Sequence, residues 1–355
     1  MKISKLLLMA FSISLFVSCS NDDDDNDNNP KGVYDNGFFI LNEGSTDVGT
    51  VSFSSDDFSI FEKDAYTAAN GSDLLGKYAQ NIFFDGDKAY IIAGGSDVIN
   101  VVNRYTFKLI AKIDTGLKNP RYGVVKDGKA YVTNANTYPE WEDSATPTAP
   151  GNTDDYVAVI DLATNKFESK INLNATGNRI VEENGKLYIT EFYVSSKLLV
   201  VNIATKALEA PIVIGVRADT MEEEDGILYI LRSPRVDRSE IVKVKLSDNT
   251  ISRITFPESL DGAGYMDIYN DKIYYTVSNS VYSINTNATA ASTTPIVTVS
   301  AIANLYGFAV NNNSIYLSDS GDYKSNSKAY IYNLTGALQK ELTVGVGPNG
   351  FYFND

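Results

Sequence analysis

A tight turn followed by a β-rich segment recurs along the whole sequence. In its clearest form, an Asp-Gly pair at 127–128 precedes Lys129–Asn134, which contains Ala, Tyr, Val and Thr. Asp-Gly favours a two-residue hairpin turn, and β-branched and aromatic residues favour strands. One aromatic residue marks each copy: Phe39, Tyr90, Tyr131, Tyr188, Tyr229, Tyr274 and Tyr316. These seven anchors lie 41 to 57 residues apart, and short strands repeated at such a period predict a propeller or similar array.

Each repeat divides into four predicted strands. In the copy around Tyr131 these are residues 120–126, 129–134, 156–161 and 166–173. The last two are joined by a short turn at 162–165, and similar connectors recur at 103–106, 202–205, 245–248 and 333–336. Four-stranded sheets repeated around an axis are the blades of a propeller. The sequence therefore predicts an all-β fold, a seven-bladed β-propeller.

The two ends of the chain predict how the ring closes. Residues 351–355 align with 123–127, the end of a first strand, whereas the ordered body begins at 35–37, a turn that leads into a second strand. The last strand of the chain should therefore complete the blade that the N-terminal strands begin. Such closure leaves no open sheet edge.

The first 31 residues differ from the rest of the chain. Residues 1–18 have a basic start and an apolar run, which is typical of a secretory signal and too short to span a membrane. Cys19, the only cysteine, follows directly. Residues 19–31 include four consecutive aspartates and predict a disordered, self-repelling tether. The propeller then occupies 32–355. A signal cleaved elsewhere, and a spacer without an address, are the alternatives.

Composition excludes several classes of function. The chain carries a formal net charge of −15 and contains no histidine. Nucleic acids are bound by clustered Lys and Arg, so the charge argues against them. The absence of histidine removes His-ligated metal sites and Ser-His-Asp or Cys-His catalysis. We expect no catalytic residues, no metal and no resident cofactor.

Two acidic stretches offer weak signals for catalysis. Residues 222–225 (Glu-Glu-Glu-Asp) lie at a predicted tight turn, where such a run is typical of a solvated surface. Glu140, Glu142 and Asp143 could supply the two carboxyls of a glycosidase. That chemistry needs a defined carboxyl separation, which a flexible loop does not provide.

The long insertions predict a working face. Loops after the second and fourth strands of a blade lie on one face, and the insertions at 64–80, 134–155 and 318–327 all belong to this class. We call it the long-loop face, and the opposite one, where the turns are predicted to be uniformly short, the tight-turn face. Binding residues gather on loops that a rigid scaffold holds. We therefore expect ligand contacts on the long-loop face.

Aromatic and arginine side chains are concentrated at these predicted loops. The arginines are expected at equivalent blade positions, and both residue types favour recognition sites. The candidate ligand-binding residues are Tyr78, Arg121, Tyr138, Trp141, Arg179, Phe192, Tyr193, Arg217, Arg232, Arg235, Tyr265, Tyr306 and Tyr323.

Two resemblances add to this interpretation. Tyr-Val-Thr-Asn at 131–134, followed by Val-Ile-Asp-Leu-Ala-Thr-Asn-Lys at 159–166, resembles the YVTN-type β-propeller repeat over essentially the whole body. Cys19 after the signal resembles a lipoprotein lipobox. Together with the acidic tether and one propeller, it resembles the Bacteroidetes surface lipoproteins that capture cobalamin for a TonB-dependent transporter. This resemblance implies a lipidated monomer on the outer membrane, facing the exterior and touching the membrane only through its anchor.

The leading functional hypothesis is a non-enzymatic surface lipoprotein that captures a small molecule for an outer-membrane transporter. A corrinoid is one candidate ligand. Without histidine, it would be recognised by shape, hydrogen bonds and stacking rather than through its metal. The first alternative is a carbohydrate- or protein-binding module. The second is a propeller lyase or glycosidase.

Overall fold

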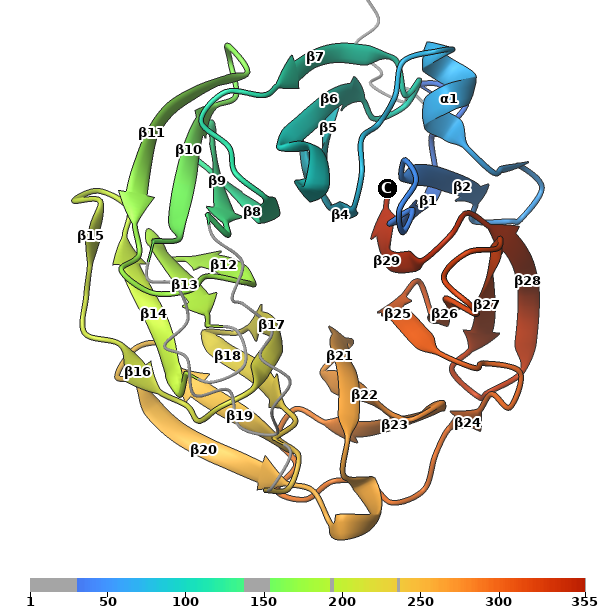
Figure 1. Cartoon of the computed structure of the whole chain (residues 1–355). Helices are drawn as coiled ribbons and strands as arrows, with labels where there is room; N and C mark the ends of the chain where they lie inside the picture. The colour runs from blue at the N-terminus through green and yellow to red at the C-terminus, as the bar shows by residue number, and fades with distance from the viewer. Residues whose placement is uncertain (1–30, 137–153, 192–194, 235–236, 355) are drawn as a thin grey trace, which may run out of the picture. The chain divides into compact units, whose positions relative to one another are not determined.

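Seven antiparallel sheets form a ring. A computed structural model describes residues 31–136, 154–191, 195–234 and 237–354, and the following concerns the compact unit Lys31–Asp355. Each sheet is one blade, and its strands run in order from the centre outwards. The innermost strands surround the middle of the ring (Figure 1); they are β29, β4, β8, β12, β17, β21 and β25. The predicted seven-bladed propeller with four-stranded blades is confirmed.

Blades 1 to 4 contain the N-terminal half of the chain. Blade 1 is β29 (Pro348–Phe353), β1 (Gly37–Asn42), β2 (Thr50–Ser55) and β3 (Phe61–Glu62). Blade 2 is β4 (Ala79–Asp85), β5 (Lys88–Ala93), β6 (Val98–Asn103) and β7 (Leu109–Ile113). Blade 3 is β8 (Pro120–Lys126), β9 (Lys129–Asn134), β10 (Tyr156–Asp161) and β11 (Lys166–Asn172). Blade 4 is β12 (Ile180–Glu183), β13 (Lys186–Thr190), β14 (Lys197–Asn202) and β15 (Ala207–Leu208), with β16 (Ile212–Val213) also paired to β14.

Blades 5 to 7 contain the remainder. Blade 5 is β17 (Ala218–Glu224), β18 (Ile227–Arg232), β19 (Glu240–Lys245) and β20 (Thr250–Thr255). Blade 6 is β21 (Ala263–Tyr269), β22 (Lys272–Val277), β23 (Ser280–Asn285) and β24 (Val297–Thr298). Blade 7 is β25 (Leu305–Asn311), β26 (Ser314–Asp319), β27 (Ser327–Asn333) and β28 (Leu338–Val344). The helical segments are α1 (Ala65–Asn70), η1 (Gly94–Ser96) and η2 (Glu258–Leu260). No described helix is long and apolar enough to cross a membrane.

The turn chemistry explains why the repeat folds into hairpins. Asp127 and Gly128 have φ values of 49° and 71°, so both residues are left-handed, as a two-residue hairpin with the right-handed strand twist requires. The pairs at 184–185 and 225–226 have the same signs. Each turn places its anchor aromatic in strand two, where it is buried. The Tyr90 ring, for example, stacks on Phe83 of the same blade with centroids 4.9 Å apart.

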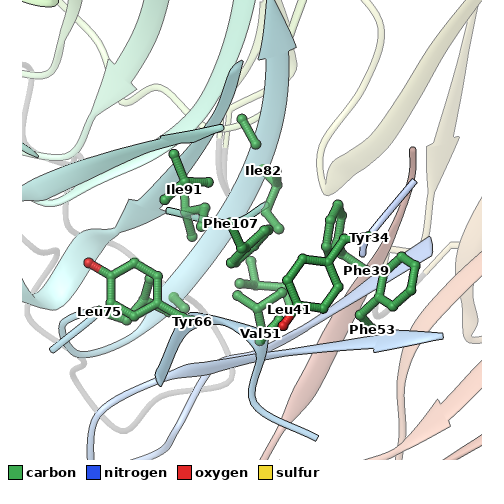
Figure 2. Close-up of a cluster of buried hydrophobic side chains, with 14 residues drawn as sticks. Tyr34, Phe39, Leu41, Val51, Phe53, Tyr66, Leu75, Ile82, Ile91 and Phe107 are labelled. Atoms are coloured by element: carbon green, nitrogen blue, oxygen red, sulfur yellow. The ribbon is translucent and has the colours of Figure 1, made fainter. Parts of the chain in front are cut away.

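Aromatic packing between blades makes up much of the core. Figure 2 shows the cluster between blades 1 and 2, where the rings of Phe39 and Phe107 lie 4.7 Å apart and Tyr34 meets Phe53 edge-on at 5.1 Å. Removing an aromatic side chain from such a core costs about 3–5 kcal/mol. The absence of disulfides from the propeller is therefore compatible with a stable fold.

The ring closes through the C-terminal strand, as predicted. β29 pairs antiparallel with β1, with Phe351 opposite Ile40 and Phe353 opposite Phe38. The buried amide of Asn354 then donates hydrogen bonds to the carbonyls of Tyr34 and Arg104, and its oxygen accepts from the Arg104 side chain. The two ends of the propeller are thus bonded to each other.

One insertion breaks the predicted rule for loops. Residues 286–296 join β23 to β24, on the tight-turn face, so the expectation that all long insertions share the other face is wrong for blade 6. This segment is bonded to the sheets. Lys243 donates to the carbonyls of Thr286 and Ala288, and the Tyr275 hydroxyl donates to the Ser292 carbonyl. It therefore connects the sheets of blades 5 and 6.

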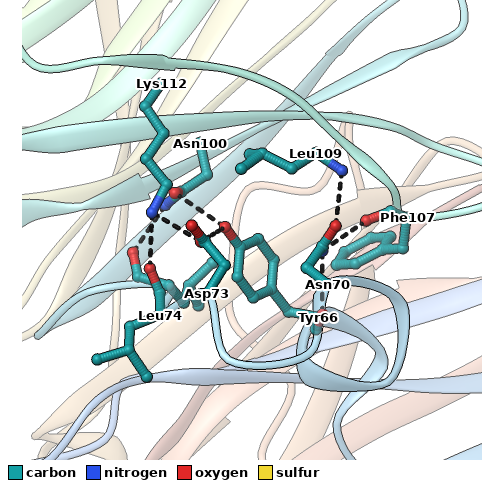
Figure 3. A network of polar contacts seen from close by, with 9 residues as sticks. Tyr66, Asn70, Asp73, Leu74, Asn100, Phe107, Leu109 and Lys112 are labelled. Carbon is teal, nitrogen blue, oxygen red and sulfur yellow. Dashed lines mark hydrogen bonds and ion pairs between the residues drawn. The ribbon is translucent and has the colours of Figure 1, made fainter.

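The insertion before β4 is equally well fixed. Tyr66 of α1 donates to Asp73 at 2.6 Å, and Asp73 pairs with Lys112 of β7 at 2.7 Å (Figure 3). Asn70 accepts from the Leu109 amide, and Asn100 donates to the Leu75 carbonyl. This part of the long-loop face is a rigid extension of blade 2.

Candidate functional site

Two positions at or just before the start of the innermost strands, on the long-loop face, carry mostly polar side chains. These positions precede six of the seven anchor aromatics, all except Phe39, by ten and nine residues, and strand pairing is shifted by a β-bulge beside them in blades 2, 3, 5, 6 and 7. Bulges re-aim side chains and are common beside functional sites. The residues ten before the anchors are Gln80, Arg121, Asn178, Asp219, Gly264 and Tyr306; those nine before are Asn81, Tyr122, Arg179, Thr220, Tyr265 and Gly307.

An arginine lies among the side chains from these positions. The Arg179 guanidinium stacks over the Tyr122 ring, 4.2 Å from its centroid, and its Nε is 3.3 Å from a carboxylate oxygen of Asp219. Asn178 donates to the same oxygen at 3.0 Å. Adjacent blades therefore fix the guanidinium by one face and one edge. Its side chain keeps 31% of its surface exposed.

Blades 1 and 2 complete this group through hydroxyl contacts. Gln80 donates to the Tyr122 hydroxyl at 2.9 Å, and Asn81 donates to the Tyr352 hydroxyl at 3.4 Å. Gly350 allows Tyr352 to fold back along β29, because a Cβ at this position would lie 2.8 Å from that hydroxyl. We call Tyr122, Arg179, Asp219, Tyr265 and Tyr352 the axial cluster.

The tyrosines of the axial cluster stay protonated at neutral pH. Burial raises the pKa of Tyr122 and of Tyr265, and it raises the pKa of Tyr352 to about 12. Removing a phenolic proton would place a negative charge in a poorly solvated environment. Their hydroxyls therefore remain available as hydrogen-bond donors.

A second polar group lies on the side of blades 7 and 1. The Tyr306 hydroxyl donates to Glu43, and the Tyr323 ring meets Tyr306 edge-on with centroids 5.2 Å apart. Burial raises the pKa of Glu43, whereas the Tyr306 hydrogen bond and the charge of Arg121 lower it. Burial is also the larger effect at Asp155 and raises its pKa to about 6, whereas the charge of Arg121 lowers that pKa.

A pocket of about 230 Å³ opens between blades 5 and 6. It adjoins the axial cluster, because Asp219 belongs to both. In blades 3, 4 and 6, a threonine of strand two accepts a hydrogen bond from the start of strand one, but blade 5 has Leu231 there. The Thr220 hydroxyl is buried without a partner among the described residues. The pocket is lined by Arg217, Ala218, Asp219, Thr220, Leu231, Ser233, Ala263 and Gly264.

The structure places the predicted site residues in three groups. Arg179 and Tyr265 are in the axial cluster, and Arg217 lines the adjoining pocket. Arg121, Tyr306 and Tyr323 belong to the second polar group, and Tyr78 is exposed directly before β4. Six positions, including the lipidation site, lie outside the described residues: Cys19, Tyr138, Trp141, Phe192, Tyr193 and Arg235.

Arg232 is placed differently from the prediction. It was expected in a loop, but it is the last residue of β18 and only 7% exposed. Its guanidinium pairs with Glu240 and donates to the Val216 carbonyl at 2.9 Å. The expectation that the arginines occupy equivalent blade positions is also wrong, because Arg217 precedes β17 whereas Arg232 ends β18. Arg232 supports the blade rather than offering free donors.

The acidic run at 222–225 is not a solvated turn throughout. Glu222 lies within β17, and its carboxyl contacts that of Asp267 in β21. Glu222 also accepts from the Ile268 amide at 3.3 Å, and Asp267 accepts from the Val310 amide at 2.6 Å. Burial raises the pKa of Glu222 strongly and that of Asp267 to about 6. The pair therefore holds a proton more tightly than free carboxyls do, and its hydrogen bonds tie together blades 5, 6 and 7.

Replacing one of these carboxyls should change how stability depends on pH. The folded protein keeps a proton that the unfolded chain loses above about pH 4, so the free energy of unfolding falls as pH rises through the raised pKa values. Above that range, each unit by which folding raises a carboxyl pKa lowers the free energy of unfolding by about 1.4 kcal/mol. Glu222→Gln retains the contacts without the charge, so it should be more stable than wild type above about pH 7. Urea unfolding between pH 5 and 8 measures this, and parallel curves for the two proteins would contradict it.

Sequence reasoning missed several members of this site. Tyr122, Asp219, Tyr352, Glu222 and Asp267 were not among the candidates. The signal was available for the first two, because they stand nine and ten residues before an anchor, as Arg179 and Asn178 do. Among the described residues, no group of three or more acidic or thiol side chains could hold a metal ion.

Comparison with known proteins identifies the fold and the family. An unassigned protein from Desulfotomaculum acetoxidans has a TM-score of 0.67 at 12% identity, covering 90% of this chain and 98% of that one. Apo AztD from Citrobacter koseri gives 0.52 at 13% identity, covering 89% and 96%. Dihydro-heme d1 dehydrogenase NirN in complex with DHE gives 0.55 at 12% identity, covering 91% and 76%. No curated protein matches in sequence. A family model for a domain of unknown function matches residues 36–304, and the chain therefore belongs to the DUF5074 family.

Proposed function

We propose that this protein is a non-enzymatic binding lipoprotein that captures a small molecule at the axial cluster. The observation that carries the proposal is the placement of Arg179, whose face is held by Tyr122 and whose Nε is held by Asp219. An arginine fixed in this way is preorganised for recognition, because little side-chain freedom is lost when a ligand binds. The exposed rings of Tyr78 and Tyr323 add contact area on the same face.

The scaffold supports binding rather than turnover. The close carboxyl pair, Glu222 and Asp267, is bonded to backbone amides of neighbouring blades, so its first role is to join strands. The axial cluster contains one carboxylate, Asp219, which Asn178 and Arg179 already engage. Tyrosine and arginine side chains that stay in one charge state at neutral pH are suited to recognition.

The proposal includes a location. Cys19 would be lipidated after removal of residues 1–18, and the acidic tether would carry the propeller to the outer face of the outer membrane. A TonB-dependent transporter would receive the ligand there, as the lipoprotein resemblance implies, and the YVTN-type repeat describes the scaffold. Cys19→Ser should release the protein from the membrane fraction. Unchanged membrane association would contradict the anchor.

Isothermal titration of the mature protein with cobalamin and cobinamide, beside a glycan array, tests the function. We expect one small molecule to bind with 1:1 stoichiometry. Tyr323→Ala should weaken that binding by about 2 kcal/mol if the ring is a central contact. The control is Lys186→Ala on the tight-turn face, where the lost exposed pair with Glu209 is worth at most about 1 kcal/mol of stability.

The outcomes separate the candidate functions. Glycan binding that depends on Tyr78 and Tyr323 would favour a carbohydrate-binding module, because exposed rings stack on sugars. Equal loss of affinity in Lys186→Ala and Tyr323→Ala would show that the long-loop face is not the site. Consumption of a bound compound by the purified protein would contradict the non-enzymatic assignment.

A further inference from the structure

The axial cluster contains more hydrogen-bond donors than acceptors. Arg179 uses only Nε in its contact with Asp219, and no described residue accepts from its two terminal amino groups. The hydroxyls of Tyr122 and Tyr352 accept from Gln80 and Asn81. Neither hydroxyl hydrogen is donated to an acceptor among the described residues. Several donors thus lie together without protein partners.

The acceptors nearby are already engaged. Asp219 accepts from both Asn178 and Arg179, and the Leu305 carbonyl accepts a long contact of 3.5 Å from the Tyr265 hydroxyl. Glu222 is close enough to Arg179 for their charges to interact, but its carboxyl is already bonded to Asp267 and to the Ile268 amide. The surplus of donors around the guanidinium therefore remains after the local acceptors are counted.

The positions of the arginines agree with this surplus of hydrogen-bond donors. The protein carries a formal net charge of −15. Three arginines nevertheless stand at or directly before the starts of the innermost strands of blades 3, 4 and 5: Arg121, Arg179 and Arg217. Arg121 is close enough to Glu43 and Asp155 for their charges to interact. Arg179 stacks on Tyr122, so it is the arginine that contacts a tyrosine of the axial cluster. A cation held in an otherwise acidic protein attracts anions locally.

We infer that the axial cluster binds an oxyanion, a carboxylate or phosphate group carried by the small molecule. The terminal amino groups of Arg179 form a planar fork that matches two oxygens of such a group. The hydroxyls of Tyr122 and Tyr352 would donate to the remaining lone pairs. The rest of the ligand would extend toward the pocket between blades 5 and 6, whose wall includes Asp219 and the unpartnered Thr220 hydroxyl. This inference rests on the proposed function and specifies its ligand chemistry.

The test is isothermal titration of the mature full-length propeller with citrate, inorganic phosphate and neutral sorbitol, at constant ionic strength set with sodium chloride. We expect saturable binding of citrate or phosphate and none of sorbitol. The anion that binds with higher affinity shows whether the site prefers a carboxylate or a phosphate. Arg179→Gln should weaken anion binding by about ten- to a hundred-fold, because hydrogen bonds to charged groups are lost. Tyr352→Phe should weaken it by about three- to ten-fold.

Two further variants serve as controls. One tests whether binding needs the bidentate geometry of Arg179 or only its charge, and the other removes an arginine outside the cluster. Arg179→Lys keeps the charge but not the bidentate geometry, so its affinity should fall between wild type and Arg179→Gln. Arg238→Gln removes an exposed arginine that pairs with Glu258 outside the cluster, and it should leave anion affinity unchanged. Each variant should melt close to wild type, because Arg179 and Tyr352 are only partly buried and Tyr352→Phe keeps the ring that packs against the core between blades 1 and 2.

Failure of this inference can be told from failure of the proposed function. Absence of saturable anion binding to wild type, or equal binding to Arg179→Gln, overturns the oxyanion site. Binding of a neutral small molecule on the same face, unaffected by Arg179→Gln, also overturns it while leaving the proposed function in place. Anion binding lost in Arg179→Gln supports the site whether or not cobalamin or cobinamide binds.

Discussion

Deletion of residues 350–355 is expected to unfold or aggregate the propeller. The deletion removes most of β29, so β1 loses its inner partner and the ring acquires an open edge. It also removes Phe351, buried among Phe38 and Tyr316, and the bonds from Asn354 to Tyr34 and Arg104. Loss of one buried phenylalanine alone costs about 3–5 kcal/mol, a large part of the 5–15 kcal/mol that stabilises a typical protein.

Thermal melting followed by circular dichroism, with size-exclusion chromatography, measures this effect. Asn354→Ala is the matched control, because it removes only the amide bonds and keeps β29. It should lower the melting temperature by much less than the deletion does. A truncated protein that stays monomeric and melts like the full-length chain would contradict the pairing of β29 with β1.

Arg232→Ala should destabilise the protein by about 3–5 kcal/mol. Arg232 and Glu240 form a pair in which both side chains are largely buried, and removal of one member leaves a charge without its main partner. Arg253 also contacts Glu240 and offsets part of the loss. Gly215 packs against the guanidinium, so truncation also leaves a void.

Urea unfolding measures the change, and Arg238→Ala is the control. Arg238 pairs with Glu258 at 3.5 Å with both side chains exposed, so this substitution should change the free energy of unfolding by less than about 1 kcal/mol. An Arg232→Ala protein as stable as wild type but defective in ligand binding would restore the interpretation of Arg232 as a free donor.

The repeat made most of the fold predictable. The hairpin pairs and β-rich segments of blade 3 gave the bounds of its first three strands, and the closure followed from which strand is missing at each end. The insertion of blade 6 was missed. Residues 286–296 lack the short connector that marks the other blades, and their fixed position depends on contacts from Lys243 and Tyr275.

The candidate site was predicted only in part, for physical reasons. Loop length pointed to the face on which the axial cluster lies, and Arg179 and Tyr265 were among the candidates. Tyr122 and Asp219 were missed because their role depends on contacts between blades, which no local pattern records. Arg232 was misplaced because the residue at a strand end can face a buried carboxylate or solvent equally well. Glu222 was misinterpreted because a run of acidic residues is usually solvated, whereas this one lies within β17, where its carboxyl meets that of Asp267.

Hydrogen–deuterium exchange of the protein with and without its tightest-binding small molecule tests the central claim most directly. The claim is that ligands bind where the innermost strands begin on the long-loop face. Bound ligand should slow exchange in peptides that contain residues 78–81, 119–122, 178–180 and 217–220, and leave the hairpin turns at 127–128, 184–185 and 225–226 unchanged. Protection confined to those turns, or to the outer strands, would contradict the account.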